Sequence, residues 1–349
     1  MRNIKINNQK FNKDNQLIIA EIGQAHEGSE GLVHSFIDAL SEAKCEAIKF
    51  QIHLADFESS LQDEFRVNFS YEDNSRYDYW KRTEFSPEQW KRIIDHCKLK
   101  KIIVGASVFS IEALNIAKNL EVDFLKIGSG DILFEELVDQ ISACDIPVIM
   151  SSGLSNWNEL SEVSSKFINH IKNEKFSILH CTTEYPTEPK RIGFNNISLI
   201  EEKFNIPSGL SDHSGNKLTS FYVLARNCSI LEVHVNFDRN MFGPDSSSSL
   251  TIKEFKEVMI TKKYFQELNT HTNKDFEEKK LSSTKIKFSR SIGIRRDIKK
   301  GEFIQKKDII YRKPGGYLGK NNLKNVIGRK AKYDLKALNI LRWEDIEEV

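Results

Sequence analysis

The sequence has few cysteines and no long apolar run. Its 349 residues include five cysteines, at positions 45, 97, 144, 181 and 228, and no two of them form a C-x-x-C pair. Such spacing argues against a disulfide framework and predicts a reducing, cytoplasmic location. No stretch of about 18 apolar residues occurs, and no apolar segment follows a basic start, so neither a transmembrane helix nor a signal peptide is predicted.

The sequence also lacks an excess of charge of either sign. Lys and Arg together number 51 and Asp and Glu together number 50, which gives a formal net charge of +1. This balance argues against nucleic acid or a membrane surface as the main partner, although a compact anionic ligand is compatible with it. At this length, a large domain plus a smaller one is expected.

Short apolar runs rich in β-branched residues alternate with amphipathic segments. Strands are predicted at 17–23, 47–51, 102–107, 124–128, 147–152, 176–181, 206–210 and 230–234. Helices are predicted at 31–44, 86–96, 110–120, 134–143, 156–170, 217–227 and 251–268. Eight strand–helix units over roughly 250 residues are typical of an α/β fold of the (β/α)₈ TIM barrel type. A doubly wound sheet is disfavoured because no Gly-rich dinucleotide fingerprint follows the first strand.

Three segments depart from this alternation. Residues 52–85, rich in aromatic side chains, are too long for an ordinary loop and are predicted to cover the barrel mouth. Residues 269–284 are charged and polar, which indicates a linker between a catalytic barrel, 1–268, and a small domain, 285–349. Within the small domain, 297–309 is echoed by 334–346, and two such facing copies can bury a shared core.

Polar side chains gather at the predicted strand ends. His213 and His234 follow the last two strands and could together hold a metal ion that polarises a substrate carbonyl. Lys49 and Lys126 lie in otherwise apolar strands, where an ammonium group is costly unless an anion compensates it. With nearby hydroxyls they predict a cradle for phosphate and carboxylate, the hydroxyls being those of Ser129, Ser151, Ser152, Thr183 and Ser211. Pairing of each lysine with a neighbouring Asp or Glu is the alternative.

Taken together, these motifs resemble the sialic acid synthase family, whose members join phosphoenolpyruvate to an N-acetylated amino sugar. The likeness covers nearly the whole chain and rests on motifs in the family's order: 20–23, 26–28, 49–51, 126–130, 179–182, 185–187, 209–213, 232–234 and 243–245. The resemblance implies a TIM barrel followed by a small β-rich SAF (antifreeze-like, β-clip) domain. It also implies a domain-swapped homodimer in which the small domain of one subunit reaches over the barrel mouth of the other.

The resemblance further implies roles for individual residues. His213 and His234 would bind a divalent metal, Mn²⁺ or Mg²⁺, and Glu21 would stabilise charge or steer water at C2 of phosphoenolpyruvate. The residues implied for phosphoenolpyruvate binding are Lys49, Ser107, Lys126, Ser129, Ser151 or Ser152, Thr183 and Ser211. Those implied to face the sugar or the reacting centre are Glu21, Gln51, Asp131, Tyr185, Asp245 and the loop with Arg312 and Lys313. Carbon–carbon bond formation to the sugar aldehyde would be followed by loss of phosphate through C–O cleavage.

The chain departs from the family pattern mainly on the predicted sugar side. Asp131 stands where the family often has Glu, Thr183 where it commonly has Asn, and Lys313 where it usually has Arg. Since Arg and Lys are not equivalent at a bidentate site, the acceptor stays open between N-acetylmannosamine and a 2,4-diacetamido hexose. Two other classes of function are a Schiff-base aldolase or lyase that uses Lys126, and a non-catalytic sugar-binding relative.

Overall fold

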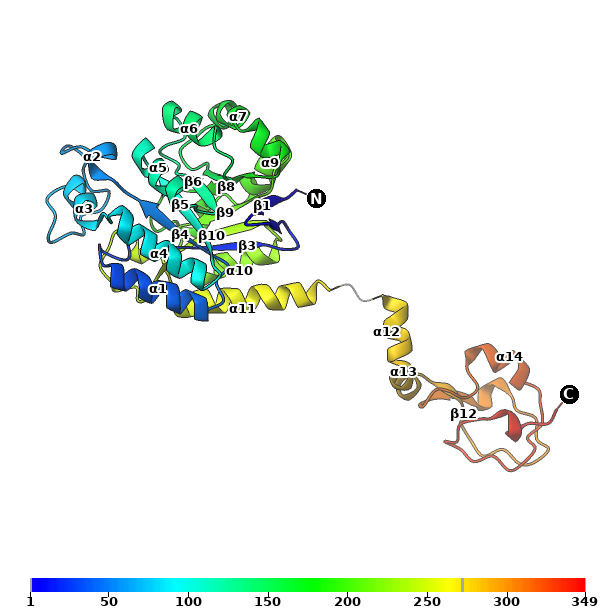
Figure 1. The fold of residues 1–349 in the computed structure, drawn as a ribbon. Coiled ribbons are helices and arrows are strands. Elements are labelled where there is room, and N and C mark those ends of the chain that lie inside the picture. The colour runs from blue at the N-terminus through cyan, green and yellow to red at the C-terminus, as the bar shows by residue number, and fades with distance from the viewer. Residues whose placement is uncertain (1, 271–272, 349) are drawn as a thin grey trace. The chain divides into compact units, whose positions relative to one another are not determined.

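A closed parallel barrel forms the first part of the chain. The computed structural model describes residues 2–270 and 273–348 and divides into two compact units, Met1–Asn269 and Thr270–Val349. The barrel strands are β3 (Leu17–Glu21), β4 (Ala47–Ile52), β5 (Ile103–Val108), β6 (Phe124–Ile127), β7 (Val148–Ser151), β8 (Phe176–Cys181), β9 (Ser208–Asp212) and β10 (Ile230–Asn236). Each strand pairs with the next, and β10 pairs with both β9 and β3, which closes the barrel (Figure 1). The predicted fold class and all eight predicted strands are confirmed.

Two strand boundaries correct the expectation. β9 extends to Asp212 and β10 to Asn236, so His213 directly follows its strand, whereas His234 lies inside β10. Within β10, the alternation of side chains therefore decides where His234 points, and it places Glu232 on the same side.

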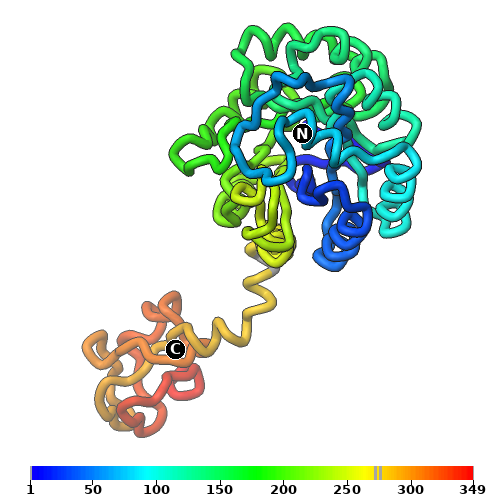
Figure 2. Tube along the Cα trace, turned by 90° about the vertical axis from the view of Figure 1, so that its left-hand side faces the viewer, coloured from blue at the N-terminus to red at the C-terminus, as the bar shows by residue number. Residues whose placement is uncertain are grey.

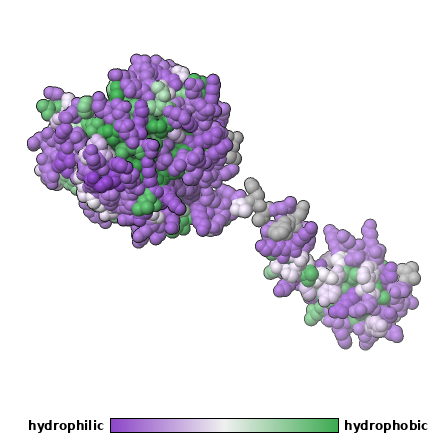
Figure 3. Space-filling view, in the orientation of Figure 1, coloured by the Kyte–Doolittle hydropathy of each residue, from purple (hydrophilic) through white to green (hydrophobic). Residues whose placement is uncertain are grey.

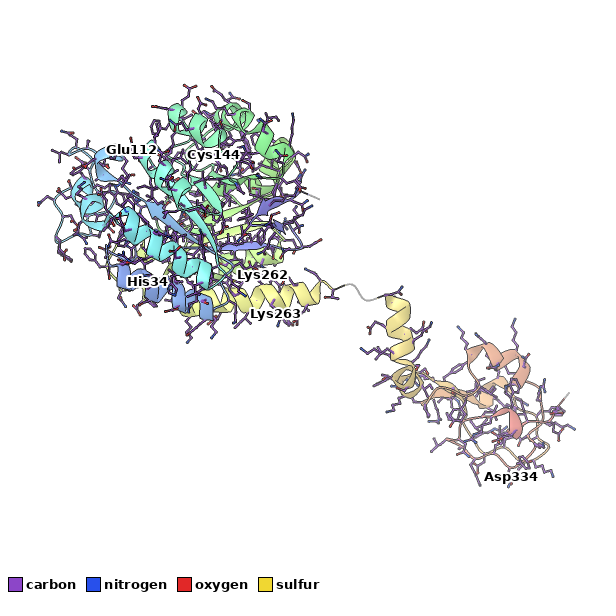
Figure 4. The ribbon with its side chains drawn as sticks, in the orientation of Figure 1. His34, Glu112, Cys144, Lys262, Lys263 and Asp334 are labelled. Carbon is purple, nitrogen blue, oxygen red and sulfur yellow. The ribbon has the colours of Figure 1, made fainter. Side chains whose placement is uncertain are left out.

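Helices surround the barrel and cover its apolar outer face (Figure 1). They are α1 (Glu30–Glu42), α4 (Pro87–Leu99), α5 (Ile111–Asn119), α6 (Glu135–Ser142), α7 (Trp157–Lys166), α8 (Ile168–Lys172), α9 (Asn195–Phe204), α10 (Lys217–Ala225) and α11 (Ile252–Leu268). The sequence pattern did not predict α9, and the single helix expected at 156–170 is divided at Phe167. On α11, Lys262 is buried and bonds the Gln16 carbonyl oxygen and Glu46, whereas Lys263 is exposed (Figure 4).

An unpredicted hairpin seals the N-terminal end of the barrel. It consists of β1 (Ile4–Ile6) and β2 (Gln9–Phe11), joined by Asn7 and Asn8, whose φ angles of 46° and 59° suit a tight hairpin turn. Its three buried side chains pack in one cluster with the inward-facing residues of the strand starts: Ile4, Ile6 and Phe11 against Leu17, Ile19, Ala47, Ile103, Phe124, Ile149, Leu179 and Ile230. Because this end is apolar and filled, polar side chains are left for the opposite end of the barrel.

The segment 52–85 forms a cap over that opposite end. It contains α2 (Ala55–Glu58) and α3 (Arg76–Thr83), which lie on the side of the barrel that faces the viewer in Figure 2. Tyr79 and Trp80 are buried in a small aromatic cluster with Phe65, Phe69 and Tyr77. This segment is called the lid below. The chain returns to the barrel mouth after β10, before the short strand β11 (Leu250–Thr251) pairs with β10.

The second unit has its own core and an internal two-fold pattern. Its elements are α12 (Lys274–Lys280), α13 (Ser282–Phe288), β12 (Ser291–Ile294), β13 (Ile309–Arg312) and α14 (Leu323–Val326). Asp297 accepts hydrogen bonds from the Ala337 amide and Lys336, and Asp334 accepts them from the Lys300 amide and Lys299. The predicted duplication is thus a pair of reciprocal turns. The segment predicted to be a linker, 269–284, contains α12 and the start of α13.

Short 3₁₀ turns occur at Pro189–Arg191, Ser246–Ser248, Lys306–Asp308, Lys320–Asn322 and Trp343–Asp345.

No helix within residues 2–270 and 273–348 is both long and apolar enough to span a membrane. Hydrophilic residues cover most of the visible face of each unit, with apolar residues scattered among them (Figure 3).

Candidate active site

A cavity of about 690 Å³ opens at the carboxyl ends of the barrel strands, beneath the lid. Most of the predicted site residues line it: Lys49, Gln51, Ser107, Lys126, Ser129, Asp131, Ser151, Thr183, Tyr185, Ser211, His213, His234 and Asp245. They come together because alternate residues of each strand face the barrel interior. Ser152, one residue beyond Ser151, does not line this cavity but a second one of about 310 Å³.

The floor of the cavity holds two lysines, each paired with a glutamate. Lys49 forms an ion pair with Glu21 and donates a 2.7 Å hydrogen bond to Ser107. Lys126 Nζ lies 2.7 and 2.8 Å from the two carboxylate oxygens of Glu232. All four charged groups are buried. The alternative of pairing with a neighbouring acid is therefore the observed arrangement, and it lies directly at the cavity.

Burial and the neighbouring opposite charges act in opposite directions on the pKa values of Glu232, Lys49 and Lys126. Burial disfavours the Glu232 carboxylate, but Lys126 and Lys49 outweigh burial and hold its pKa well below the ordinary range. Burial likewise disfavours the Lys49 ammonium, yet Glu21 and Glu232 raise its pKa. For Lys126 burial prevails over Glu232 and lowers the pKa. An ammonium group has three donors, so Lys49 keeps one beyond its two partners for a ligand in the cavity.

Glu232 is a site residue that the sequence-based assignment left without a role. It accepts a 2.9 Å hydrogen bond from Ser211 as well as the contacts from Lys126. The available signal was its position two residues before His234 on one strand, since residues i and i+2 share a face.

The two predicted metal ligands lie side by side above the floor. The ring centroids of His213 and His234 are 5.6 Å apart. His213 Nδ1 lies 3.0 Å from the Thr182 carbonyl oxygen, which assigns the proton to Nδ1 and leaves the Nε2 lone pair free. Burial and neighbouring His234 lower the pKa of His213 to about 3, so the ring is neutral, the form that binds metals.

His234 leaves a buried nitrogen without a hydrogen-bond partner. Its Nδ1 makes no hydrogen bond to any residue in the described part of the chain, and it lies 4.0 Å from Asp245 Oδ2. Gly23, with φ of +54°, lies against this nitrogen: a Cβ there would come within 3.4 Å of it. Among residues 2–270 and 273–348, no three His, Cys, Asp or Glu side chains are yet grouped to hold a metal. The orphaned nitrogen, the neutral ring and the adjacent carboxylate nevertheless fit a divalent cation.

The lid supplies groups at the mouth that the sequence did not identify. His53, which the sequence pattern left without an assigned role, stacks between Trp80 and Phe109 with centroid distances of 3.8 and 4.3 Å. Arg66 lies 3.6 Å above the Tyr185 ring and donates a 2.8 Å hydrogen bond to Asp245. Positions such as these depend on the path of a long loop, which no periodicity in the sequence reveals.

Asp131 is an unusual carboxyl group at the mouth. Burial and the nearby Glu58 raise its pKa to about 7. Glu58 in turn contacts His53 Nδ1 at 2.5 Å. A carboxyl group that changes charge near neutral pH can donate a hydrogen bond in one state and only accept hydrogen bonds in the other.

The remaining predicted residues are in the second unit. Arg312 ends β13 opposite Ser291, and Lys313 Nζ lies 4.9 Å from the Phe288 ring centroid. Their contact with a sugar stays a prediction.

Comparisons with known proteins show which families and folds the chain is similar to. A family model described as NeuB family matches residues 36–274, and a SAF domain model matches residues 289–347. The chain is 26% identical to N,N'-diacetyllegionaminic acid synthase of Legionella pneumophila, over 95% of this chain and 94% of that one. It is 28% identical to pseudaminic acid synthase of Campylobacter jejuni, over 97% of this chain and 98% of that one. The crystal structure of N-acetylneuraminic acid synthetase from Leptospira borgpetersenii superposes with a TM-score of 0.68 at 26% identity, over 81% of this chain and 96% of that one.

Proposed function

Because the chain belongs to the NeuB family, we propose that it condenses phosphoenolpyruvate with an N-acetylated amino sugar to give a nonulosonic acid and phosphate. The observation that carries the proposal is the cavity floor, where Lys49 and Lys126 face a space beside two adjacent histidines. Each ammonium group keeps a donor beyond its protein partners, and such donors with hydroxyl groups around them suit the oxygens of phosphate and carboxylate.

Phosphoenolpyruvate occupies the floor in this proposal. Lys49 and Lys126 bind its phosphate and carboxylate, assisted by hydroxyl groups of Ser107, Ser129, Ser151, Thr183 and Ser211. Glu21 and Glu232 fix the two amines before the substrate arrives, so little reorganisation is needed when the anion binds. The balanced charges of the floor also explain why four ionised groups can stay buried without substrate.

The reaction forms a carbon–carbon bond and replaces the phosphate oxygen at C2 with an oxygen from water. C3 of phosphoenolpyruvate attacks the aldehyde carbon of the open-chain sugar, water adds at C2, and phosphate departs with the C2–O bond broken. Glu21, which is ion-paired with Lys49, stabilises positive charge at C2 or orients the water. A divalent cation, Mn²⁺ or Mg²⁺, held by His213 and His234 would supply Lewis-acid polarisation of the aldehyde.

In this proposal the acceptor lies nearer the lid. Gln51, Asp131, Tyr185 and Asp245 line the same cavity and are assigned to the sugar, and the aromatic side chains of the lid suit the apolar faces and methyl groups of an N-acetylated sugar. N-acetylmannosamine and a 2,4-diacetamido hexose are the candidates. We further propose a cytoplasmic homodimer in which Arg312 and Lys313 of one subunit reach the sugar bound by the other.

Release of inorganic phosphate tests the proposal. The chain is incubated with phosphoenolpyruvate, Mn²⁺ and each candidate sugar in turn. Phosphate release that requires both substrates, with a nonulosonic acid detected by mass spectrometry, is the expected result. Sugar binding without phosphate release would instead favour the non-catalytic relative.

A second candidate reaction is favoured by one observation, the lowered pKa of Lys126. A buried lysine of this kind can form a Schiff base with a carbonyl substrate. Opposing it, both carboxylate oxygens of Glu232 lie within 2.8 Å of the amine and stabilise its protonated form. Borohydride trapping with a carbonyl substrate distinguishes the two, since only the aldolase leaves a stable adduct on Lys126.

A further inference from the structure

One lid residue contacts the partners of both candidate metal ligands. Arg66 stacks on Tyr185 at 3.6 Å and donates a 2.8 Å hydrogen bond to Asp245 Oδ1. Tyr185 in turn stacks on His213, with ring centroids 4.1 Å apart, and Asp245 Oδ2 lies 4.0 Å from His234 Nδ1. The Arg66 guanidinium therefore contacts one neighbour of each histidine, Tyr185 beside His213 and Asp245 beside His234.

The separation of Asp245 from His234 is slightly too long for two ligands of one small cation. With metal–ligand bonds of about 2.1 Å, two adjacent ligand atoms are typically about 3.0 to 3.4 Å apart. Asp245 Oδ2, at 4.0 Å from His234 Nδ1, would need to approach the histidine to share an ion with it. The hydrogen bond from Arg66 to the other carboxylate oxygen opposes that movement.

The surroundings of Arg66 allow its side chain to move away from Asp245. Arg66 belongs to residues 59–75, a stretch between α2 and α3 with no helix or strand, and its side chain is 39% exposed. Asp245, by contrast, keeps only 21% of its side chain exposed, and its carboxylate is paired with the Arg66 guanidinium. If Arg66 left, another cation would have to take its place.

We propose that Arg66 and a divalent cation compete for Asp245. Without the cation, the guanidinium is the counter-ion of the carboxylate. When the cation binds to His213 and His234, Asp245 turns to it as a third protein ligand and Arg66 is released. The inference rests on the metal site of the proposed function and adds to it a third ligand and a lid residue that sets cation affinity.

A double-mutant cycle on cation affinity tests this competition. Mn²⁺ binding to metal-free protein is measured by titration calorimetry for wild type, Arg66→Met, Asp245→Asn and the double variant. Arg66→Met should bind Mn²⁺ roughly tenfold more tightly, the scale of one charge-assisted hydrogen bond, and Asp245→Asn roughly tenfold more weakly. In the Asp245→Asn background, Arg66→Met should have no further effect.

The cycle separates competition from simple repulsion between Arg66 and the ion. Repulsion would persist when Asp245 is replaced, so a gain in affinity that survives in the double variant overturns the proposal. So does an unchanged affinity in Arg66→Met. Arg76→Met is the matched control, because Arg76 also lines the cavity from the lid but contacts Asp63 and Trp80; its Mn²⁺ affinity should equal that of wild type. Arg66→Lys, which keeps the charge, provides a second variant and should give an intermediate affinity.

Phosphate release measured on the same wild-type preparation distinguishes the two levels of failure. Mn²⁺-dependent turnover together with a failed cycle overturns only the role of Arg66. Absence of both turnover and Mn²⁺ binding overturns the proposed function and this inference with it.

Discussion

The floor and the mouth of the cavity are built in different ways. On the floor, Lys49, Lys126 and Glu232 project from barrel strands whose register fixes them, and every charge has a buried partner. At the mouth, Arg66 and Trp80 come from a lid of two short helices and an irregular stretch. Strand-borne groups are positioned by the sheet, whereas lid-borne groups depend on contacts that can be exchanged. The difference suggests a fixed anion site and an adaptable acceptor site.

Replacing Lys126 should have the largest effect on both turnover and stability, because it removes a charge from the fixed floor. Lys126→Met should abolish turnover and lower the free energy of unfolding by ~3–5 kcal/mol, because Glu232 becomes an unpaired buried charge. Urea unfolding and phosphate release measure the two effects. Adding Glu232→Gln should recover most of the stability but none of the turnover. Full turnover in either variant contradicts a floor that binds substrate through this amine.

His213→Ala should leave the fold intact and slow the reaction roughly 10²- to 10³-fold, since several kcal/mol of transition-state stabilisation are lost. The loss in structure is small: one hydrogen bond to the Thr182 carbonyl and one stacked ring. Phosphate release with and without added Mn²⁺ is the measurement. His96→Ala, on the outer helix α4, should retain the wild-type metal dependence. Full wild-type turnover in the presence of a chelator would refute a metal role.

Asp131, at the mouth, makes the free energy of unfolding of the protein depend on pH. Its folded-state pKa is raised from 3.8 to about 7, so the folded state binds more protons than the unfolded state between these values and stability falls as pH rises. Asp131→Asn should remove that loss, gaining ~1–3 kcal/mol over wild type at pH 8 and little at pH 3. Chemical unfolding across this range measures it, with the exposed Asp14→Asn as control. A pH-independent difference between variant and wild type would contradict the raised pKa.

The smallest effect on catalysis is expected from replacing Arg76, which lies 5.2 Å from the Trp80 ring centroid at the mouth. Arg76→Met should raise the KM for the sugar roughly two- to fivefold, the scale of a single exposed cation–π contact, and leave the KM for phosphoenolpyruvate unchanged. Initial rates with each substrate varied separately provide both constants. An equal effect on both would mean that floor and mouth are not independent.

The same contrast explains what the sequence could predict. Barrel strands were recognisable because buried parallel strands are continuous apolar runs, and polar residues at their ends stood out against that background. Glu232 did not stand out, since it lies in the middle of β10 beside His234. Arg66 and His53 were inaccessible to such reasoning, because a long loop has no periodicity that says which side chains turn inward. The hairpin that seals the barrel was missed because its strands have three residues each.

The fate of the bridging oxygen of phosphoenolpyruvate tests the central claim most directly. Phosphoenolpyruvate labelled with ¹⁸O between C2 and phosphorus is incubated with the chain, Mn²⁺ and the sugar that supports turnover, and the products are analysed by mass spectrometry. Cleavage of the C2–O bond predicts that the label leaves in inorganic phosphate and that the nonulosonic acid is unlabelled by it. Label retained in the sugar acid, or no phosphate with any candidate sugar, would contradict the account.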